Sequence, residues 1–411
     1  MLAADGTPLK VSLARAMRRQ KLRALMLVAP LFLFIVLTFI GPIADMLFRS
    51  VENSLVPDTL PRTVEALESW DPDSGELPGE EVYAALAADM SEAFEAKMHT
   101  RLGSRLNYEY SGASSVFRAS GRQATQMEGG NYKEQFLEIN PGWGDIGLWK
   151  TIYQFSGHYT PGYFLNAADA QLTVDGIKLK PDGERIYLYL FWRTLLLSMT
   201  ITATCILLGY PIAWLLANLP LRTSNLLLIL VLLPFWTSLL VRTSSWIVLL
   251  QQNGVINDLL VYSGILSDQN RLQMMFNQTG TIVAMTHILL PFMVLPLYSV
   301  MKTIPPAYVR AAKSLGATDW TAFWRVYFPN TVPGIGAGSI LVFILSIGYY
   351  ITPELVGGTD GIFISNRIAY HISSSLNWGL AAALGVILLV VVLGLYWCYD
   401  KIVGIDNVKL G

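Results

Sequence analysis

Residues 308–333 read YVRAAKSLGATDWTAFWRVYFPNTVP and form the longest polar interruption in the hydrophobic second half of the chain. Strongly apolar segments lie on both sides of this segment. Backbone polar groups find no water in the hydrocarbon core of a bilayer, so a polar segment between two membrane spans must lie in water on one face of the membrane. The segment therefore predicts an integral membrane protein with a docking surface between two of its spans.

Local signals within this segment predict two short helices joined at a glycine. Ala311 and Ala312 are small and let another backbone come close. Gly316 can end a helix by adopting positive φ, and Thr318 can cap the helix that follows. Pro329 is expected to end this second helix before the next span begins.

The composition also indicates a membrane protein. Of the 411 residues, 53% are hydrophobic and 14% are charged, and the mean hydropathy is +0.44. These values lie far on the apolar side for a soluble protein. The formal net charge of −1 indicates no general affinity for nucleic acid. Cysteine and histidine residues form no cluster with metal-ligand spacing, so we expect no metal site.

The first part of the chain predicts one membrane helix followed by a large polar insert. A basic segment, residues 1–23, precedes an apolar run at residues 24–48 that is too long for the core of a signal peptide. Residues 49–185 then carry about 20 acidic and about a dozen basic side chains, and none of this block could span a membrane. The charge bias predicts a cytoplasmic amino terminus and an insert outside the cytoplasm, in the periplasm.

Two features within the insert predict local structure. Apolar residues recur every four positions between residues 80 and 98 and predict an amphipathic helix. Aromatic residues crowd residues 143–164. They could contact a binding protein or the membrane surface, but a small satellite core is the interpretation that we favour.

Residues 186–400 resume the membrane pattern and predict transmembrane helices 2 to 6. The expected spans are 186–220, 226–250, 279–300, 331–352 and 377–399. Six spans place both termini and the polar loop, residues 303–330, on one side, which their basic residues identify as the cytoplasm. Residues 401–411 form a short cytoplasmic tail. The predicted fold class is thus an all-α integral membrane protein with six transmembrane helices and a large extracytoplasmic insert between helices 1 and 2.

The polar loop resembles the cytoplasmic EAA loop of the permease subunits of ABC importers. That motif is Glu-Ala-Ala, three residues, Gly, nine residues, an aliphatic residue, one residue and an apolar-Pro pair, and the spacing here matches throughout. The matching positions are Arg310, Ala311, Ala312, Gly316, Val326, Phe328 and Pro329. Arg310 departs from the family, which usually has Glu at this position.

This resemblance implies a type I importer fold and a coupling helix that docks on a separate ATPase subunit. The residues that we expect to couple the two subunits are Arg310, Ala311, Ala312, Gly316, Thr318 and Asp319. The chain has no GxxxxGK[ST] motif to cradle a phosphate and no visible catalytic triad. We therefore expect a transporter subunit that is not itself an enzyme and holds no cofactor, with ATP and Mg bound by the partner ATPase.

Three further segments resemble permeases of the spermidine/putrescine type. They read GYPIAWLLANLP at residues 209–220, PFWTSLLVR at 234–242 and LLPFMVLPLY at 289–298. The resemblance implies import of polyamines or related small amines across the bacterial inner (plasma) membrane. It also implies a heterodimer with a second permease subunit, a pair of ATPase subunits and a periplasmic solute-binding protein.

A pathway for multivalent cations needs carboxylates and aromatic faces that replace the hydration shell. The candidates in or near the predicted spans are Trp236, Asp258, Tyr349, Tyr350 and Glu354. Structural roles are the alternatives. Glu354 could cap a helix or pair with Arg367, and Trp236 and Tyr349 could be packing or interface aromatics.

Other functions are also compatible with parts of this pattern. The solute could be another small molecule, such as an opine, an amino acid derivative or a metal oxyanion. A transporter that works alone on an ion gradient would usually show internal repeats and charges at mid-span, and neither is clear here. A membrane-anchored sensor or structural protein, with the insert as its working part, would not need the docking loop.

Overall fold

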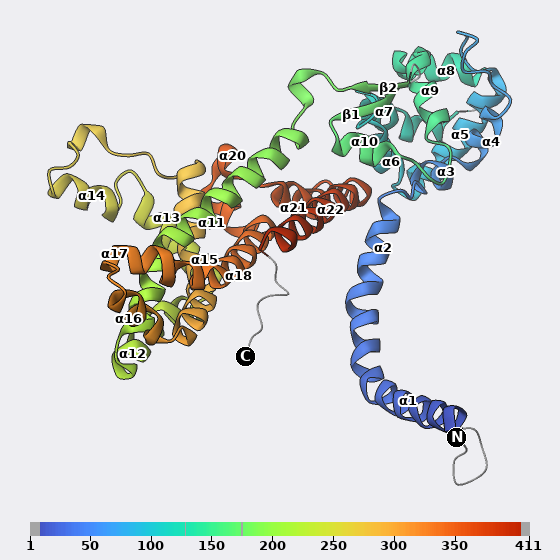
Figure 1. Cartoon of the computed structure of the whole chain (residues 1–411). Helices are drawn as coiled ribbons and strands as arrows, with labels where there is room; N and C mark the ends of the chain where they lie inside the picture. The colour runs from blue at the N-terminus through green and yellow to red at the C-terminus, as the bar shows by residue number, and fades with distance from the viewer. Residues whose placement is uncertain (1–8, 128, 174–175, 404–411) are drawn as a thin grey trace. The chain divides into compact units, whose positions relative to one another are not determined.

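The computed structural model describes residues 9–127, 129–173 and 176–403, and the chain divides into two compact units (Figure 1). The first unit holds the residues up to 102 together with 116–161. The second unit holds 103–115 together with the residues from 162 onward. The polar block at 49–185 is therefore shared between the two units, and its last part belongs with the membrane helices.

The first unit begins with a long apolar helical segment. It comprises α1 (Leu9–Ile35), a π-helical turn η1 (Val36–Ile40) and α2 (Gly41–Arg49). Within Gln20–Arg49 the most apolar stretch of 18 residues has a mean hydropathy of 2.6, and it is not buried against any other described part of the chain. A helix that is apolar on all its faces needs lipid or protein around it, as expected of the predicted first span.

The rest of the first unit is a small helical domain built around Trp143. This side chain is fully buried, and its ring packs against Phe117, Phe136 and Trp149 at centroid distances of 5.1, 5.3 and 5.5 Å. The indole N–H of Trp143 donates to Ser120 Oγ at 2.7 Å, which satisfies the only polar atom of the buried ring. The predicted satellite core is thus confirmed for this part of the aromatic segment.

The helices of this domain are short. They are α3 (Leu55–Thr59), α4 (Pro61–Leu67), α5 (Glu80–Glu95), α6 (His99–Leu106), α7 (Ala113–Ala124), α8 (Tyr132–Ile139), η2 (Pro141–Gly144) and α9 (Ile146–Gln154). Helix α5 covers most of the predicted amphipathic helix and buries Val82, Leu86 and Met90. Helix α6 and helix α7 each cross from one unit to the other.

Three long helices form the centre of the second unit, and each packs on the other two. They are α11 (Tyr187–Asn218), α15 (Gln278–Thr303) and α18 (Phe328–Gly348). Met293 of α15 is fully buried between glycines of its two neighbours. A Cβ added to Gly338 of α18 would lie 2.7 Å from Met293 Sδ, and one added to Gly209 of α11 would lie 3.0 Å from Met293 Cγ. Small residues therefore let these helices approach closely.

The predicted third span is not one straight helix. Its residues lie in α12 (Leu221–Leu232), η4 (Leu233–Trp236) and α13 (Leu239–Leu250), and α14 (Val255–Tyr262) follows them. The segments Leu221–Trp236 and Leu239–Tyr262 meet at 97°, so they form a broken span or a re-entrant loop. The helix breaks because Thr237 and Ser238 adopt extended backbone conformations directly after the Pro234 turn. Over the described residues, five helices are long and apolar enough to cross a membrane, or six if this bent pair counts as one.

The expectation that Pro329 ends a helix is wrong. Helix α17 (Asp319–Ala322), the π-helical turn η6 (Phe323–Tyr327) and α18 run on as one helical segment, Asp319–Gly348. Phe328 N–H donates to Phe323 O, five residues back, so the helix is wider just before Pro329. The wider turn accommodates the proline ring, and the fifth span begins inside the polar loop instead of after it.

The last part of the polar block is tied to the membrane helices. It contains α10 (Gly162–Ala167), the antiparallel strands β1 (Ala170–Thr173) and β2 (Gly176–Leu179), and η3 (Asp182–Glu184). The buried Asp169 carboxylate accepts hydrogen bonds from the backbone N–H groups of Ile186, Tyr187 and Leu188 at 2.8–3.0 Å. These donors belong to the first turn of α11, where no intrahelical acceptor exists, so Asp169 caps this span.

Several short elements and one long helix complete the second unit. They are η5 (Asp268–Asn270), α16 (Pro306–Ser314), α19 (Ile351–Val356), α20 (Gly358–Gly361), α21 (Ile364–Ser373) and the last long helix, α22 (Trp378–Val403). The ring of Tyr163 from α10 covers Gly379 of α22, where an added Cβ would lie 2.3 Å from the ring. Only glycine permits this contact.

Candidate functional site

The polar loop begins with α16, which ends in a Schellman motif. Gly316 adopts φ = +90°, its N–H donates to Lys313 O at 2.9 Å, and Ala317 N–H donates to Ala312 O at 3.1 Å. These two bonds satisfy carbonyls that the helix end would otherwise leave free. Because residues with a side chain rarely adopt this φ, Gly316 sets the angle at which α16 meets the next helix.

The second helix of the loop is capped as the sequence predicts. Thr318 Oγ1 accepts a hydrogen bond from Thr321 N–H at 3.3 Å, and Asp319 lies in the first turn of α17. The Asp319 carboxylate also pairs with Lys313 of α16. This ion pair links the two helices across the glycine, so the coupling residues named from the sequence lie together on one compact feature.

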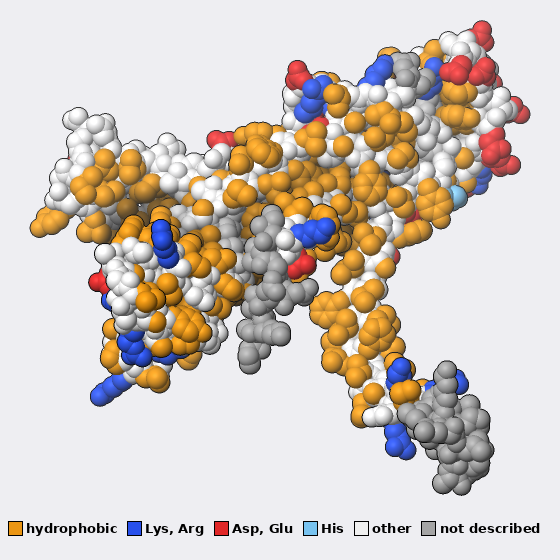
Figure 2. All heavy atoms as spheres, in the orientation of Figure 1, with side chains coloured by type: hydrophobic (Ala, Val, Ile, Leu, Met, Phe, Trp, Pro, Cys, Tyr) orange, Lys and Arg blue, Asp and Glu red, His pale blue; other side chains and the backbone are white. Residues whose placement is uncertain are grey.

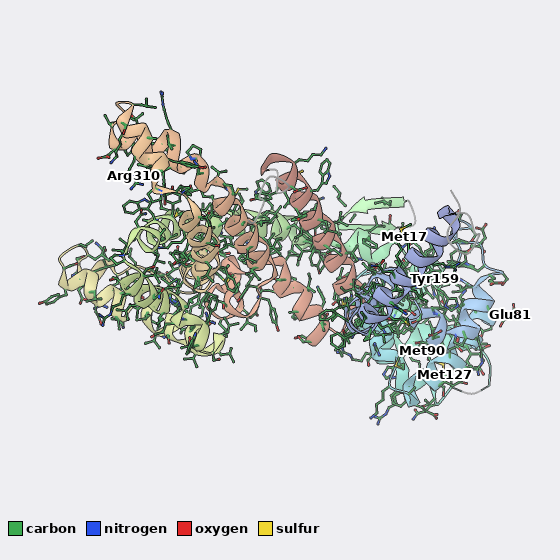
Figure 3. All side chains as sticks on the ribbon, turned by 60° about the horizontal axis from the view of Figure 1, so that its bottom comes forward. Met17, Glu81, Met90, Met127, Tyr159 and Arg310 are labelled. Carbon is green, nitrogen blue, oxygen red and sulfur yellow. The ribbon has the colours of Figure 1, made fainter. Side chains whose placement is uncertain are left out.

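This feature exposes an unusual amount of aromatic and aliphatic surface. Leu315 is 90% exposed and Trp320 is 72% exposed, and Tyr308 and Trp324 also face outward. Arg310 is exposed on α16 (Figure 3). Figure 2 shows Lys and Arg side chains gathered over the end of the second unit that carries α12, α16 and α17. An apolar patch with a basic rim is the surface expected of a protein-docking site.

A second candidate site lies where α18 ends. The backbone leaves the helix at Tyr349 and Tyr350, and their carbonyls accept hydrogen bonds from Ser365 Oγ at 2.7 Å and from the Asn366 side chain at 2.9 Å. The same Asn366 amide donates to Glu354 Oε2 at 2.5 Å. One buried side chain thus bridges the free backbone of the break and the carboxylate of Glu354. Irregular backbone in a membrane protein is stable only where such partners replace the missing helix bonds.

Glu354 also lines a polar cavity of about 310 Å³. Arg367 and Tyr370 lie on its wall, and the Arg367 guanidinium stacks over the Tyr370 ring at 5.8 Å. Glu354 forms no ion pair with Arg367 or with any other described residue, so the local-pairing alternative does not account for its charge. The cavity therefore offers a carboxylate, a guanidinium and an aromatic face to a small solute.

The other predicted pathway residues lie elsewhere in the second unit. Trp236 is 87% exposed at the break between η4 and α13. Asp258 of α14 forms an ion pair with Arg271 at 2.7 Å, and Asp268 binds the same guanidinium at 2.8 Å. Asp258 is thus paired with a guanidinium that it shares with Asp268. Tyr349, Tyr350 and Glu354 are the three pathway candidates that the structure brings together.

A buried chain of polar side chains, which was not predicted from the sequence, joins α11 to α21. Tyr187 Oη lies 2.9 Å from His371 Nε2, and Ser375 Oγ lies 2.8 Å from His371 Nδ1. Tyr187 begins α11 and His371 lies near the end of α21, so 184 residues separate the two partners in the chain. A lone tyrosine and a lone histidine carry no local signal of such pairing.

Acidification is expected to loosen this junction between α11 and α21. Burial, aided by the nearby charges of Arg367 and Lys180, lowers the pKa of His371 from 6.5 to about 4. The unfolded chain therefore takes up this proton first, so the His371 contribution to stability is complete above about pH 6.5 and is lost progressively towards pH 4. We expect a loss of about 2 kcal/mol between pH 7 and pH 5 from this residue.

The thermal unfolding temperature of the purified chain at several pH values measures this effect. His371→Asn should flatten the pH dependence, whereas His158→Asn, which changes an exposed histidine, should not. An unchanged slope in His371→Asn would show that other groups cause the loss.

Several known proteins are similar to this chain in sequence. Residues 207–403 match the family described as "Binding-protein-dependent transport system inner membrane component". The chain is 35% identical over 217 residues to the "Spermidine/putrescine transport system permease protein PotB" of Salmonella typhimurium (strain SL1344), covering 52% of this chain and 75% of that relative. It is 30% identical over 262 residues to the "Inner membrane ABC transporter permease protein YdcU" of Escherichia coli (strain K12), covering 61% of this chain and 82% of the relative.

A solved structure also resembles the chain. It is described as the crystal structure of a bacterial ABC transporter involved in the import of the acidic polysaccharide alginate. The TM-score is 0.44 at 21% sequence identity, and the match covers 54% of this chain and 80% of the other.

The chain therefore belongs to the family of inner membrane components of binding-protein-dependent transport systems. It is a permease subunit of an ABC importer and a multi-pass protein of the inner membrane. Proteins of this family are membrane transport subunits and not catalytic enzymes.

Proposed function

We propose that this permease imports polyamines or related small amines, driven by a separate ATPase that docks on the loop at residues 308–329. The similarity to a spermidine/putrescine permease over 75% of that relative's length carries the choice of solute. The unpaired carboxylate of Glu354 beside the break at Tyr349 and Tyr350 supports it, because a cationic solute needs a negative partner on a pathway through lipid.

The assembly that we propose contains four kinds of component. This chain pairs with a second permease subunit, two ATPase subunits bind ATP and Mg and dock on the polar loops, and a periplasmic solute-binding protein delivers the solute. Both termini lie in the cytoplasm in this arrangement, and the first unit's small helical domain lies in the periplasm. The exposed apolar patch of Leu315 and Trp320 supports the docking assignment.

An amino acid derivative is the second candidate solute. The cavity beside Glu354 is also lined by Arg367, which would attract a carboxylate as Glu354 attracts an ammonium group. A pathway used by a polyamine alone would not need this guanidinium. The two candidates therefore differ in whether the solute carries a negative group.

The test is the ATPase activity of the complete complex in nanodiscs. Binding protein loaded with putrescine or spermidine should stimulate ATP hydrolysis, and binding protein loaded with a zwitterionic amino acid derivative should not. Stimulation by the zwitterion alone would replace the polyamine by the second candidate. Failure of any ATPase to co-purify with the chain would contradict the docking role of the loop.

A further inference from the structure

A cleft whose largely apolar wall carries several charged side chains lies beneath the polar loop, separate from the cavity at Glu354. It has a volume of about 620 Å³ and opens between the ends of α11 and α15 on one side and α16, α17 and η6 on the other. Helix α11 ends at Asn218 and α15 ends at Thr303, so the cleft sits where membrane spans end and the polar loop begins. A group bound there would contact both the spans and the loop.

The cleft has an excess of positive charge. Its wall carries Lys302, Arg310 and Lys313, against one carboxylate, that of Asp319. Two of the three cations are already engaged: Lys302 Nζ donates to Ala217 O at 3.2 Å, and Lys313 pairs with Asp319. Arg310 forms no ion pair and no side-chain hydrogen bond with any residue that the structure describes. A guanidinium left in this state is suited to a planar or tetrahedral oxyanion.

A buried hydroxyl points to the same conclusion. Tyr327 is only 8% exposed, it lines the cleft, and its hydroxyl forms no hydrogen bond within the described structure. The Asn218 side chain, which donates to Trp214 O at 2.8 Å, lies beside this hydroxyl. A buried polar atom without a partner costs free energy, so a bound acceptor is expected to satisfy this hydroxyl.

We propose that the cleft binds the phosphate of an anionic phospholipid headgroup from the leaflet that faces the polar loop. Arg310 and Tyr327 would donate to the phosphate, and Lys302 would add its charge. Trp214 on the cleft wall is 42% exposed at the same level and is suited to the membrane interface, where the acyl chains of such a lipid begin. Basic pockets at the cytoplasmic ends of membrane helices are known to suit anionic headgroups.

A lipid bound in this cleft would give a role to Arg310, which stands where the importer family usually has Glu. A headgroup held by Arg310 of α16 and Lys302 of α15 bridges the polar loop to the membrane helices. Occupancy then stabilises one position of α16, and the lipid composition of the membrane becomes an input to ATPase docking. The inference concerns the chain itself and does not depend on which solute is transported.

Lipid retention by the purified full chain tests the proposal. The chain is extracted in detergent, exchanged into mixtures of phosphatidylglycerol and phosphatidylethanolamine, and examined by native mass spectrometry. We expect one tightly held phosphatidylglycerol in the unmodified chain and at least about tenfold weaker retention in Arg310→Gln and Lys302→Gln. Arg222→Gln and Arg325→Gln remove basic residues of the same region that do not line the cleft, and they should retain the lipid.

A second measurement distinguishes loss of the lipid site from failure of a variant to fold. Phosphatidylglycerol should raise the thermal unfolding temperature of the unmodified chain and of Arg222→Gln, but not of a folded Arg310→Gln. Inorganic phosphate at millimolar concentration distinguishes a free anion from a lipid. If phosphate displaces the lipid and gives the same thermal shift alone, the source is a soluble anion and the lipid assignment is overturned.

The last outcome distinguishes two candidate ligands of the cleft, a lipid headgroup and a carboxylate of the ATPase subunit. If Arg310→Gln retains phosphatidylglycerol normally but binds the ATPase subunit more weakly, the cleft takes a carboxylate of the ATPase and the proposal is wrong. Loss of lipid retention in a complex that still hydrolyses ATP would support the lipid site whatever the imported solute proves to be.

Discussion

Replacing Glu354 by glutamine is expected to reduce uptake of the cationic solute by at least about tenfold. Glutamine keeps an oxygen that accepts the hydrogen bond from Asn366, so the break at Tyr349 and Tyr350 should persist. The change removes the negative charge from the cavity, and a multivalent cation then loses a charge partner on its pathway. A tenfold effect corresponds to about 1.4 kcal/mol, a modest value for one such interaction.

Uptake of labelled polyamine by membrane vesicles that contain the complete complex measures this effect. Asp360→Asn is the matched control, because Asp360 is an exposed carboxylate of α20 that does not line the cavity. The control should transport normally. Unchanged uptake by Glu354→Gln, with its protein level maintained, would remove Glu354 from the pathway.

Replacing Gly316 by valine is expected to abolish uptake while the protein still inserts into the membrane. No atom lies within 4 Å of a Cβ added at this position, so steric overlap is not the cause. The cause is the backbone, because φ = +90° is costly for a residue branched at Cβ. The turn between α16 and α17 would relax to another conformation, and the docking patch would lose its shape.

Insertion level, co-purification of the ATPase and ATP hydrolysis stimulated by loaded binding protein together report on this variant. Gly394→Val is the matched control: Gly394 of α22 also has open space around it, but its backbone is helical. The control should remain active. Normal stimulation of ATP hydrolysis in Gly316→Val would contradict the coupling role of the loop.

Short-range patterns predicted the polar loop well, and the reason is physical. The turn at Gly316 and the cap at Thr318 depend on hydrogen bonds within five residues, which a sequence displays directly. The same local logic failed at Pro329. A proline usually ends a helix, but here a π turn precedes it, and the rings of Phe323 and Tyr327 stack within that turn at 5.9 Å. That packing is not visible in local propensity.

The solute site was predicted less completely for a related reason. Glu354 and the two tyrosines stand within six residues and could be proposed together. Asn366, which holds them in place, acts from a separate helix, and its role depends on the chain turning back on itself. Asp258 was also a candidate from the sequence, and the fold pairs it with Arg271. Whether a carboxylate is free or neutralised is a tertiary property.

One continuous helix joins the two sites. The segment Asp319–Gly348 has 30 residues, which at about 1.5 Å per residue gives a rod of roughly 45 Å. Its first residue lies in the docking loop and Tyr349 follows its last, and the segment between them stays helical through the wider turn η6. A rod of this kind passes on a tilt or a rotation as a rigid body. A displacement of the water-exposed loop is therefore expected to accompany a rearrangement at the tyrosine break. A single spectroscopic probe at either end of the helix would report on both.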